Sequence, residues 1–291
     1  MSTSPDTERQ ESKKDERRYD DEWRQMFTDP TSELNKILQG FRNDFMRMTG
    51  TRRCTMCAAP FDGDGPLEGR SPNSLNPNFC NSCDGWMKAN FPGRVIDSFP
   101  IISFDMRGSS VVARQHTKDG KYQDEYEDPF MAAASQALVD TDGFIVDTRG
   151  DELRGLYPSG FSGKDNVKKA WNSALILLRD PPKKYDGTII PFGIAVHIGD
   201  TAIGSKGKPP NFLGCSISGD GINTCSHMCS HARRGEALIS EIVFQKTGMR
   251  TDALEQRRIP LKGDPEQPTG ISDLILVYVL TAESKVKPFE F

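Results

Sequence analysis

The sequence contains neither a recognisable membrane span nor a secretory leader. No apolar run approaches the roughly 18 residues that a transmembrane helix requires, and the N-terminus lacks the hydrophobic segment of a signal peptide. Charge of one sign is also scarce, because 37 basic and 41 acidic residues leave a net charge of −4. Such a chain has no basic excess with which to bind a polyanion. We therefore expect a cytoplasmic protein with neither a membrane nor nucleic acid as its partner.

The sequence has seven cysteines, and an odd number cannot all pair in disulfides. In a cytoplasmic protein, cysteines are more typically free thiols or metal ligands. Four of them form two CxxC pairs, Cys54/Cys57 and Cys80/Cys83, with 22 residues between the pairs. Two such pairs can close a tetrahedral tetrathiolate site that leaves no open position, so we predict one structural Zn²⁺. The segment between them is too polar to form a core, so the metal would supply folding free energy on the order of 10 kcal/mol. The alternative is four buried thiols without metal.

Composition divides the chain into four parts. Residues 1–25 are mostly charged and polar, which predicts a disordered tail. Residues 26–50 contain apolar side chains at helical spacing after Ser32, which predicts a helix. Residues 51–96 form the cysteine-rich module. Residues 97–291 contain alternating helix and strand patterns, which predict a larger globular domain.

The larger domain alternates between the two periodicities of secondary structure. We expect helices at 129–140, 166–178 and 222–234, a hairpin at 143–157, and strands at 101–104, 191–198, 237–240 and 274–280. This order predicts an α+β fold with a mixed, mainly antiparallel sheet flanked by helices.

Two aspartates stand at predicted strand ends. Asp105 ends a hydrophobic strand and is followed by the Gly108-Ser109-Ser110 turn, and Asp151 lies in the turn of the hairpin. Two such carboxylates can hold a pair of Mg²⁺ or Mn²⁺ ions, and backbone N–H groups of the turn can approach a polyphosphate. Taken alone, each aspartate is more often a turn or cap residue.

Together with the C-terminal half, these motifs resemble the class III nucleotidyl (adenylate/guanylate) cyclases. Asp105 and Asp151 are 46 positions apart, as in that family, with Gly108 and Gly150 at the expected places. The segment 217–240 resembles the family's Gly-Asp-x-Val-Asn helix and the Gly-Glu-x-Leu-Ile-Ser strand that follows it. The resemblance covers about residues 97–282. It implies a class III cyclase catalytic domain that converts a nucleoside triphosphate into a 3′,5′-cyclic nucleotide and pyrophosphate.

The resemblance also implies roles for individual residues. Two Mn²⁺ or Mg²⁺ ions per active site would be held by Asp105, Asp151 and the Met106 carbonyl. Asn223 would orient the ribose and Lys262 would reach the phosphates. His227 stands where the family usually has a transition-state arginine, a role open to a protonated imidazole. Arg233, Arg234 or an arginine near Asp151 could compensate, and the other interpretation of His227 is an exposed helix residue. The expected substrate-binding residues are Phe104, Gly108, Ser109, Ser110, Asp147 and Ser216.

In the family, the metal aspartates and the asparagine of one active site come from different chains. This chain holds each set once, so the resemblance implies a homodimer with two composite sites.

The base is indicated by two positions. Adenylyl members have a lysine where this chain has Asp147, and a carboxylate accepts a ring N–H, which guanine N1 and uracil N3 both offer. Guanylyl members have Glu and Cys where this chain has Asp147 and Ser216. The minimal architecture resembles the pyrimidine cyclases of Pycsar anti-phage defence, which implies UTP as substrate, cyclic UMP as product and a separate effector protein.

The alternatives are a guanylate or adenylate cyclase in general signalling, a dinucleotide-making polymerase, and a catalytically inactive cyclase-like binding protein. The cysteine-rich segment also resembles a module found ahead of some bacterial class III cyclases.

Overall fold

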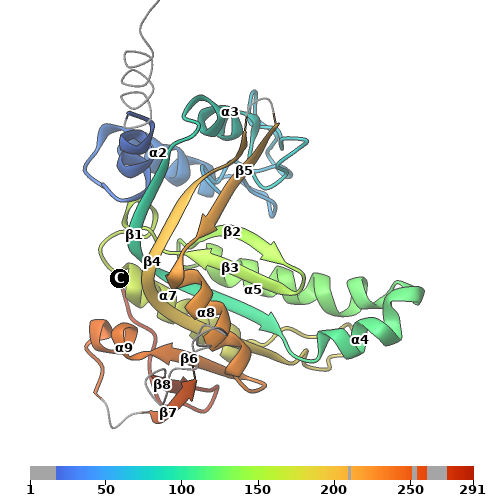
Figure 1. Cartoon of the computed structure of the whole chain (residues 1–291). Coiled ribbons are helices and arrows are strands. Elements are labelled where there is room, and N and C mark those ends of the chain that lie inside the picture. The colour runs from blue at the N-terminus through green and yellow to red at the C-terminus, as the bar shows by residue number, and fades with distance from the viewer. Residues whose placement is uncertain (1–17, 209–210, 251–253, 261–273) are drawn as a thin grey trace, which may run out of the picture. The chain divides into compact units, whose positions relative to one another are not determined.

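The computed structural model describes residues 18–208, 211–250, 254–260 and 274–291 (Figure 1). The chain divides into two compact units. The N-terminal unit comprises residues up to 97 together with 159–163 and 202–218, and the second unit comprises 98–158, 164–201 and 219–291. The segments 159–163 and 202–218 therefore belong with the N-terminal unit, although a boundary near residue 97 assigns them to the larger domain.

The N-terminal unit is built on helices and the cysteine-rich loops. Residues 18–27 are helical, with Trp23 and Phe27 fully buried, so ordered structure begins within the region predicted as a tail. Helix α2 (Glu33–Met46) starts at Ser32, whose side chain accepts a hydrogen bond from the backbone N–H of Asn35. This is the capping contact that satisfies a free N–H of the first turn. The unit also contains helix α3 (Asn81–Ala89) and strand β5 (Asn211–Ser218).

The other strands are β1 (Arg94–Met106), β2 (Phe144–Arg149), β3 (Glu152–Leu156), β4 (Phe192–Lys208), β6 (Glu236–Ser240), β7 (Glu255–Pro260) and β8 (Leu274–Leu280). The sheet has the strand order β2-β3-β1-β4-β6-β8-β7, and β5 pairs with β4 outside this path. Every pairing with a resolved register is antiparallel except that of β4 with β6, which confirms the predicted mixed, mainly antiparallel sheet.

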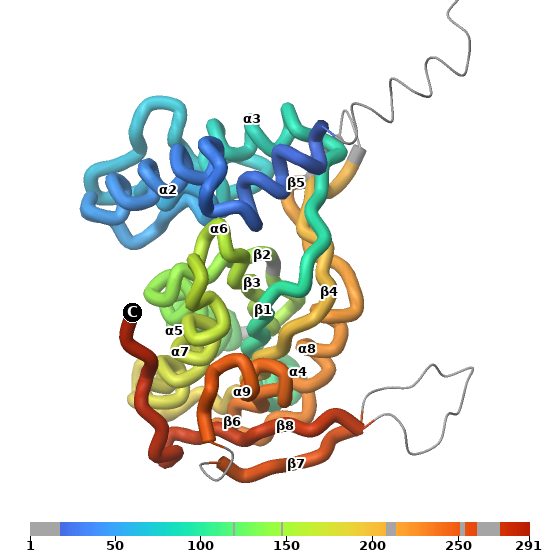
Figure 2. Tube along the Cα trace, turned by 90° about the vertical axis from the view of Figure 1, so that its left-hand side faces the viewer, coloured from blue at the N-terminus to red at the C-terminus, as the bar shows by residue number. Residues whose placement is uncertain are grey.

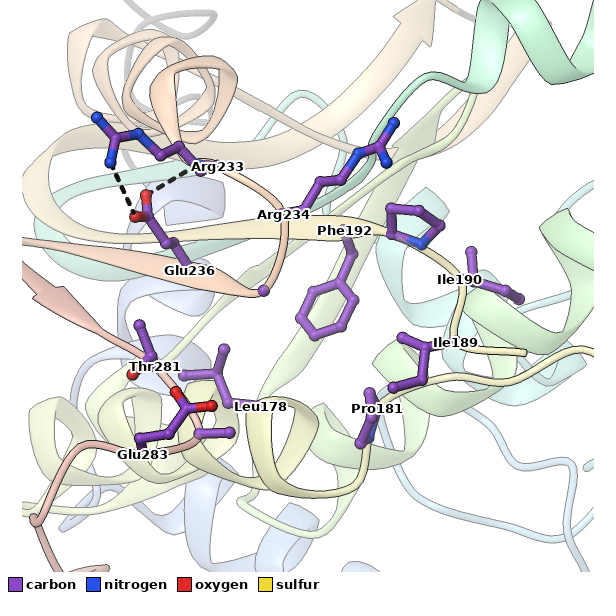
Figure 3. A pocket seen from close by; sticks show the side chains of 13 residues that line it. Leu178, Pro181, Ile189, Ile190, Phe192, Arg233, Arg234, Glu236, Thr281 and Glu283 are labelled. Atoms are coloured by element: carbon purple, nitrogen blue, oxygen red, sulfur yellow. Dashed lines mark hydrogen bonds and ion pairs between the residues drawn. The ribbon is translucent and has the colours of Figure 1, made fainter. Parts of the chain in front are cut away.

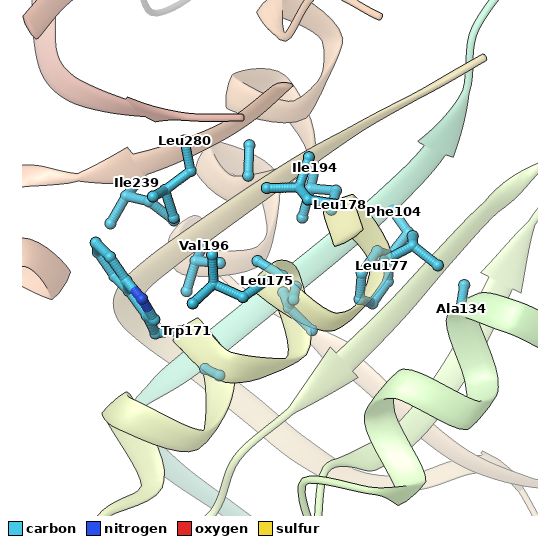
Figure 4. Packing of buried hydrophobic residues seen from close by; sticks show 14 of the residues in the cluster. Phe104, Ala134, Trp171, Leu175, Leu177, Leu178, Ile194, Val196, Ile239 and Leu280 are labelled. Carbon is cyan, nitrogen blue, oxygen red and sulfur yellow. The ribbon is translucent and has the colours of Figure 1, made fainter. Parts of the chain in front are cut away.

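Helices cover both faces of the sheet in the second unit. Figures 1 and 2 place α5 (Asp128–Val139) and α7 (Asn166–Arg179) on one face and α8 (Asp220–His231) on the other. The core between α7 and the strands contains Trp171, Phe104 and Val196, all fully buried (Figure 4). The shorter helices are α4 (Ser109–His116), a 3-10 turn (Thr117–Asp119), a π-helical turn (Gln123–Glu127), α6 (Ser159–Ser162) and α9 (Glu241–Thr247).

The predicted hairpin, the helices at 129–140 and 166–178 and the strand at 274–280 are confirmed. Strands β1 and β4 are longer than predicted because each continues through polar, exposed positions such as Asp97 and Asp200. Strands β5 and β7 and helices α4 and α9 were not expected from the sequence. Among the described residues, no helix has the length and apolar character needed to cross a membrane.

Candidate active site and candidate zinc centre

The first candidate site lies where β1 meets the β2–β3 hairpin. Asp105 is opposite Glu152 in the antiparallel pairing of β1 with β3. Asp151 precedes Glu152 in the turn, and Gly150 supplies the left-handed backbone, with φ of +59°. Only glycine adopts this conformation freely. The hairpin therefore brings Asp151 and Glu152 to the end of β1 beside Asp105.

The electrostatics of Asp105 reflect this crowding. Burial raises the pKa of the Asp105 carboxyl to about 6, Arg107 opposes the shift, and the charges of Asp151 and Glu152 add to it. Burial also raises the pKa of Tyr122 to about 12, with Asp151 and Glu127 contributing. Acidic groups from three segments thus share one region, which is the arrangement that a divalent cation stabilises.

Arg107 is the neighbour of Asp105 that the sequence analysis missed. Its guanidinium pairs with the Asp105 carboxylate and donates to the carbonyl oxygen of Cys229 in α8. A Cβ atom at Gly193 would lie 2.2 Å from a guanidinium nitrogen, so a larger residue there would displace the Arg107 side chain from this position. Arg107 lies in the turn just after β1, so strand periodicity did not indicate its contact with Asp105.

The turn after β1 leads directly into a helix. Gly108 has φ of +77° and precedes α4, whose first residues are Ser109 and Ser110. The first N–H groups of a helix have no partner within it and carry partial positive charge. The predicted anion-binding turn is therefore the N-terminus of α4. Phe104 is fully buried in the hydrophobic core, and Met106 is 3% exposed. The backbone carbonyl is the only oxygen donor that a methionine offers.

Helix α8 presents two faces. The buried face carries Cys225 and Cys229, whose Sγ atoms contact the carbonyl oxygens of Ile101 and Ser103 in β1. Asn223 is exposed on the opposite side. Four residues further on, the Nε2 atom of His227 lies 2.9 Å from the Pro260 carbonyl oxygen and 3.3 Å from His231 Nε2. Asn223 and His227 thus lie at i, i+4 spacing on the helix, pointing away from the strand that carries Asp105.

The other predicted residues are distributed as follows. Asp147 lies in β2, opposite Arg154 of β3. Ser216 lies in β5, opposite Gly204, and belongs to the N-terminal unit. Lys262 is outside the described residues. Arg233 and Arg234 line a cavity of about 510 Å³ whose apolar wall includes Leu178, Ile189 and Phe192 (Figure 3).

The second candidate site is the cluster of Cys54, Cys57, Cys80 and Cys83. All four are buried, and their Sγ atoms lie within 4.8 Å of one another. The Sγ atoms of Cys57 and Cys80 are 3.7 Å apart. Zn–S bonds of about 2.3 Å in tetrahedral geometry place sulfurs about 3.8 Å apart, so the cluster fits one Zn²⁺ ion.

Arg70 completes this cluster and was also missed from the sequence. Its guanidinium lies 3.5 Å from Cys57 Sγ, 3.8 Å from Cys80 Sγ and 3.9 Å from Cys83 Sγ. The same group stacks over the rings of Phe41 and Phe45 in α2, 4.8 and 5.5 Å from their centroids. A tetrathiolate zinc centre carries two net negative charges, so a cation beside it reduces the cost of burying it. Arg70 also ties the centre to α2.

No protein-family model and no curated protein matches the sequence. Solved structures do match the fold. The chain aligns over 63% of its length with 91% of the guanylyl cyclase Cya2, with 16% identity and a TM-score of 0.53. It aligns over 64% of its length with 97% of the guanylate cyclase domain of RhGC from Catenaria anguillulae in complex with GTP, with 21% identity and a TM-score of 0.50. The adenylyl cyclase CyaB from P. aeruginosa matches over 67% of this chain and 99% of its own, with 14% identity and a TM-score of 0.50. The fold is that of a class III cyclase catalytic domain, as predicted. At these identities the likeness defines the fold alone.

Proposed function

We propose that this chain is a nucleotidyl cyclase, which converts a nucleoside triphosphate into a 3′,5′-cyclic nucleotide and pyrophosphate. The observation that carries the proposal is the meeting of Asp105 and Asp151 at the end of β1, next to the N-terminus of α4, on a cyclase fold. A scaffold without activity gains nothing from carboxylates crowded in this way.

The donor set suits hard divalent cations. Asp105, Asp151 and the Met106 carbonyl supply oxygen ligands of the kind that Mg²⁺ and Mn²⁺ prefer. Two such ions activate an attacking hydroxyl and neutralise phosphate charge. Arg107 already donates to Asp105, so it would share this carboxylate with a cation and hold it in place.

The remaining groups would bind and orient the substrate. The free N–H groups of Ser109 and Ser110 suit the triphosphate. Asn223 would orient the ribose, and Lys262 and His227 would face the phosphates. Because α8 directs Asn223 away from β1, we propose that it serves the site of a second copy, in a homodimer with two composite sites.

For the base we propose uracil. The Asp147 carboxylate would accept from uracil N3–H, and Ser216, half-exposed in β5, would donate to a carbonyl oxygen. Cyclic UMP would then act on a separate effector in Pycsar-type antiviral defence. Guanylate cyclase is the second candidate, because guanine N1–H suits the same carboxylate and two of the similar structures are guanylyl cyclases.

The test is a competition among ATP, GTP, CTP and UTP at equal concentration with Mn²⁺, followed by chromatography of the products. We expect cyclic UMP to dominate, and Asp147→Ala to lower the preference for UTP over CTP more than it lowers total turnover. Dominant cyclic GMP would favour the guanylate candidate. Absence of any cyclic product from well-folded, zinc-containing protein would contradict the proposed function.

A further inference from the structure

Helix α8 carries a pair of histidines one turn apart. The Nε2 atoms of His227 and His231 are 3.3 Å apart, and the two rings meet edge to face with centroids 4.8 Å apart. The Pro260 carbonyl oxygen at the end of β7 lies 2.9 Å from the same Nε2 atom of His227. Both rings are half-buried, so a small ion can reach them from solvent.

Protons satisfy this group of three atoms poorly. If His227 Nε2 donates a proton to Pro260, it has no lone pair with which to accept a hydrogen bond from His231. If it accepts from His231 instead, the Pro260 carbonyl loses this donor. A three-centre bond from His227 Nε2–H to both acceptors would divide one donor between them. A cation satisfies all three atoms at once, because each of them presents a lone pair to it.

The spacing of the nitrogens matches that of two ligands on one metal ion. Metal–nitrogen bonds of about 2.0–2.1 Å at a tetrahedral angle place the nitrogens about 3.3 Å apart. Histidines at positions i and i+4 of a helix lie on one face, as in known helical zinc sites. Both the sequence spacing and the observed 3.3 Å separation therefore fit metal coordination.

We propose that His227 and His231, with the Pro260 carbonyl as third donor, bind a divalent transition metal ion such as Zn²⁺, Ni²⁺ or Cu²⁺. Imidazole nitrogens favour these ions, whereas Mg²⁺ prefers oxygen ligands. The chain then separates metals by donor type: oxygens at Asp105 and Asp151, sulfurs at the four cysteines, and nitrogens on α8.

The ion would place positive charge at His227, where the cyclase pattern has an arginine. Its effect on turnover rests on the proposed function, but its binding does not. The test is therefore a binding experiment, and failure of cyclase activity leaves its result interpretable.

Ni²⁺ is the probe, titrated calorimetrically into full-length, zinc-replete protein with excess Mg²⁺ to occupy the carboxylates. We expect about one Ni²⁺ per chain. His231→Gln should weaken this binding at least about tenfold, since even indirect partners of metal ligands contribute 10–100-fold. His116→Gln is the matched control, because His116 stacks on Tyr126 elsewhere in the unit and should keep the wild-type affinity. Asp105→Ala should also keep it, which separates this site from the carboxylates.

Unchanged Ni²⁺ affinity in folded His231→Gln protein would overturn the proposal, as would no Ni²⁺ binding by wild type. In the latter case the pair is a shared hydrogen bond only. If the variant does not fold, the wild type still decides the matter. Paramagnetic Ni²⁺ should broaden the ring-proton resonances of two of the four histidines first. Equal broadening of all four, or broadening of none, would contradict the site.

Discussion

At the scale of single residues, opposing effects act on the ionisation of the Asp105 carboxyl. Burial and the charges of Asp151 and Glu152 disfavour its ionised form and Arg107 favours it, with the result that the pKa is raised to about 6. Burial is the largest of these effects. A divalent cation would neutralise part of the negative charge at the end of β1.

These opposing effects make stability depend on pH in the absence of Mg²⁺ and Mn²⁺. The folded-state pKa of Asp105 lies above its ordinary value of 3.8, so its contribution is fully present below about pH 4 and is lost as pH rises through 6. Relative to wild type, Asp105→Asn should therefore gain about 2 kcal/mol of unfolding free energy between pH 4 and 7. Urea unfolding of both proteins at pH 4 and pH 7, without chelators that would remove zinc, measures this difference in unfolding free energy. Asp180→Asn, whose side chain is 89% exposed, controls for loss of a surface carboxylate. A difference in unfolding free energy between variant and wild type that does not change with pH would contradict the description of Asp105.

Arg107 and Arg70 show why the sequence did not disclose the whole site. Arg107 reaches Cys229, 122 positions away, and Arg70 reaches cysteines on both sides of the loop that carries it. A long side chain can choose among many partners, and only the folded chain decides which are near. The aspartates and the cysteines could be selected as candidates because their spacing in the sequence matches patterns of metal ligands.

At the scale of elements, the sequence predicted best where burial imposes a period. Strand β8 is apolar along its whole length and was predicted with its observed bounds. Strand β1 was predicted only over its buried half, because its first residues are largely exposed and polar. Helix α8 owes its position to close backbone contact, since a Cβ atom at Gly221 would lie 2.5 Å from the carbonyl carbon of Gly199.

Gly221→Ala should therefore destabilise the protein by about 2 kcal/mol through overpacking against backbone that cannot yield. The matched control is Gly85→Ala in α3, where an added Cβ meets no atom within 4 Å. That change should be neutral or stabilise by up to about 1 kcal/mol, since alanine favours a helix interior. Chemical denaturation of both variants gives the comparison. Equal effects of the two substitutions would contradict the packing of α8.

The cysteine cluster predicts the zinc content of the protein. Purified protein should contain about one zinc per chain, the stoichiometry of a closed tetrathiolate site. Cys57→Ser should lose the metal and lower the melting temperature, whereas Cys215→Ser, outside the cluster, should retain it. Metal analysis and thermal unfolding of the same samples provide the test. Metal-free wild type with an unchanged melting temperature in chelator would rule out a zinc centre.

At the scale of the whole molecule, the fold and the candidate site differ in how far sequence determines them. The α+β class was predicted from the periodicity of apolar residues. The cyclase fold was predicted from the resemblance of three short motifs to the class III cyclases. The assignment of residues 159–163 and 202–218 to the N-terminal unit could not be predicted, because it depends on contacts between distant segments. The proposed homodimer would likewise depend on contacts between two chains, and the position of Asn223 on α8 motivates its test.

Asp105→Ala and Asn223→Ala proteins should each be inactive and should regain activity when mixed. A mixed dimer has one site with both defects and one with neither, so about a quarter of wild-type activity is the ceiling for random exchange. Differently tagged subunits establish that exchange has occurred. Mixtures that stay inactive after proven exchange would show that each chain builds its own site.

The central claim, cyclase chemistry at the Asp105–Asp151 pair, is tested most directly by following both products in one reaction. Wild type with Mn²⁺ and its preferred triphosphate should release pyrophosphate and cyclic nucleotide in equal amounts. Asp151→Asn should reduce both by about 10³-fold or more, since a metal ligand supports several kcal/mol of transition-state stabilisation. Asp180→Asn should leave both unchanged. Persistent cyclic nucleotide formation by folded Asp151→Asn protein, or pyrophosphate without cyclic product from wild type, would contradict the account.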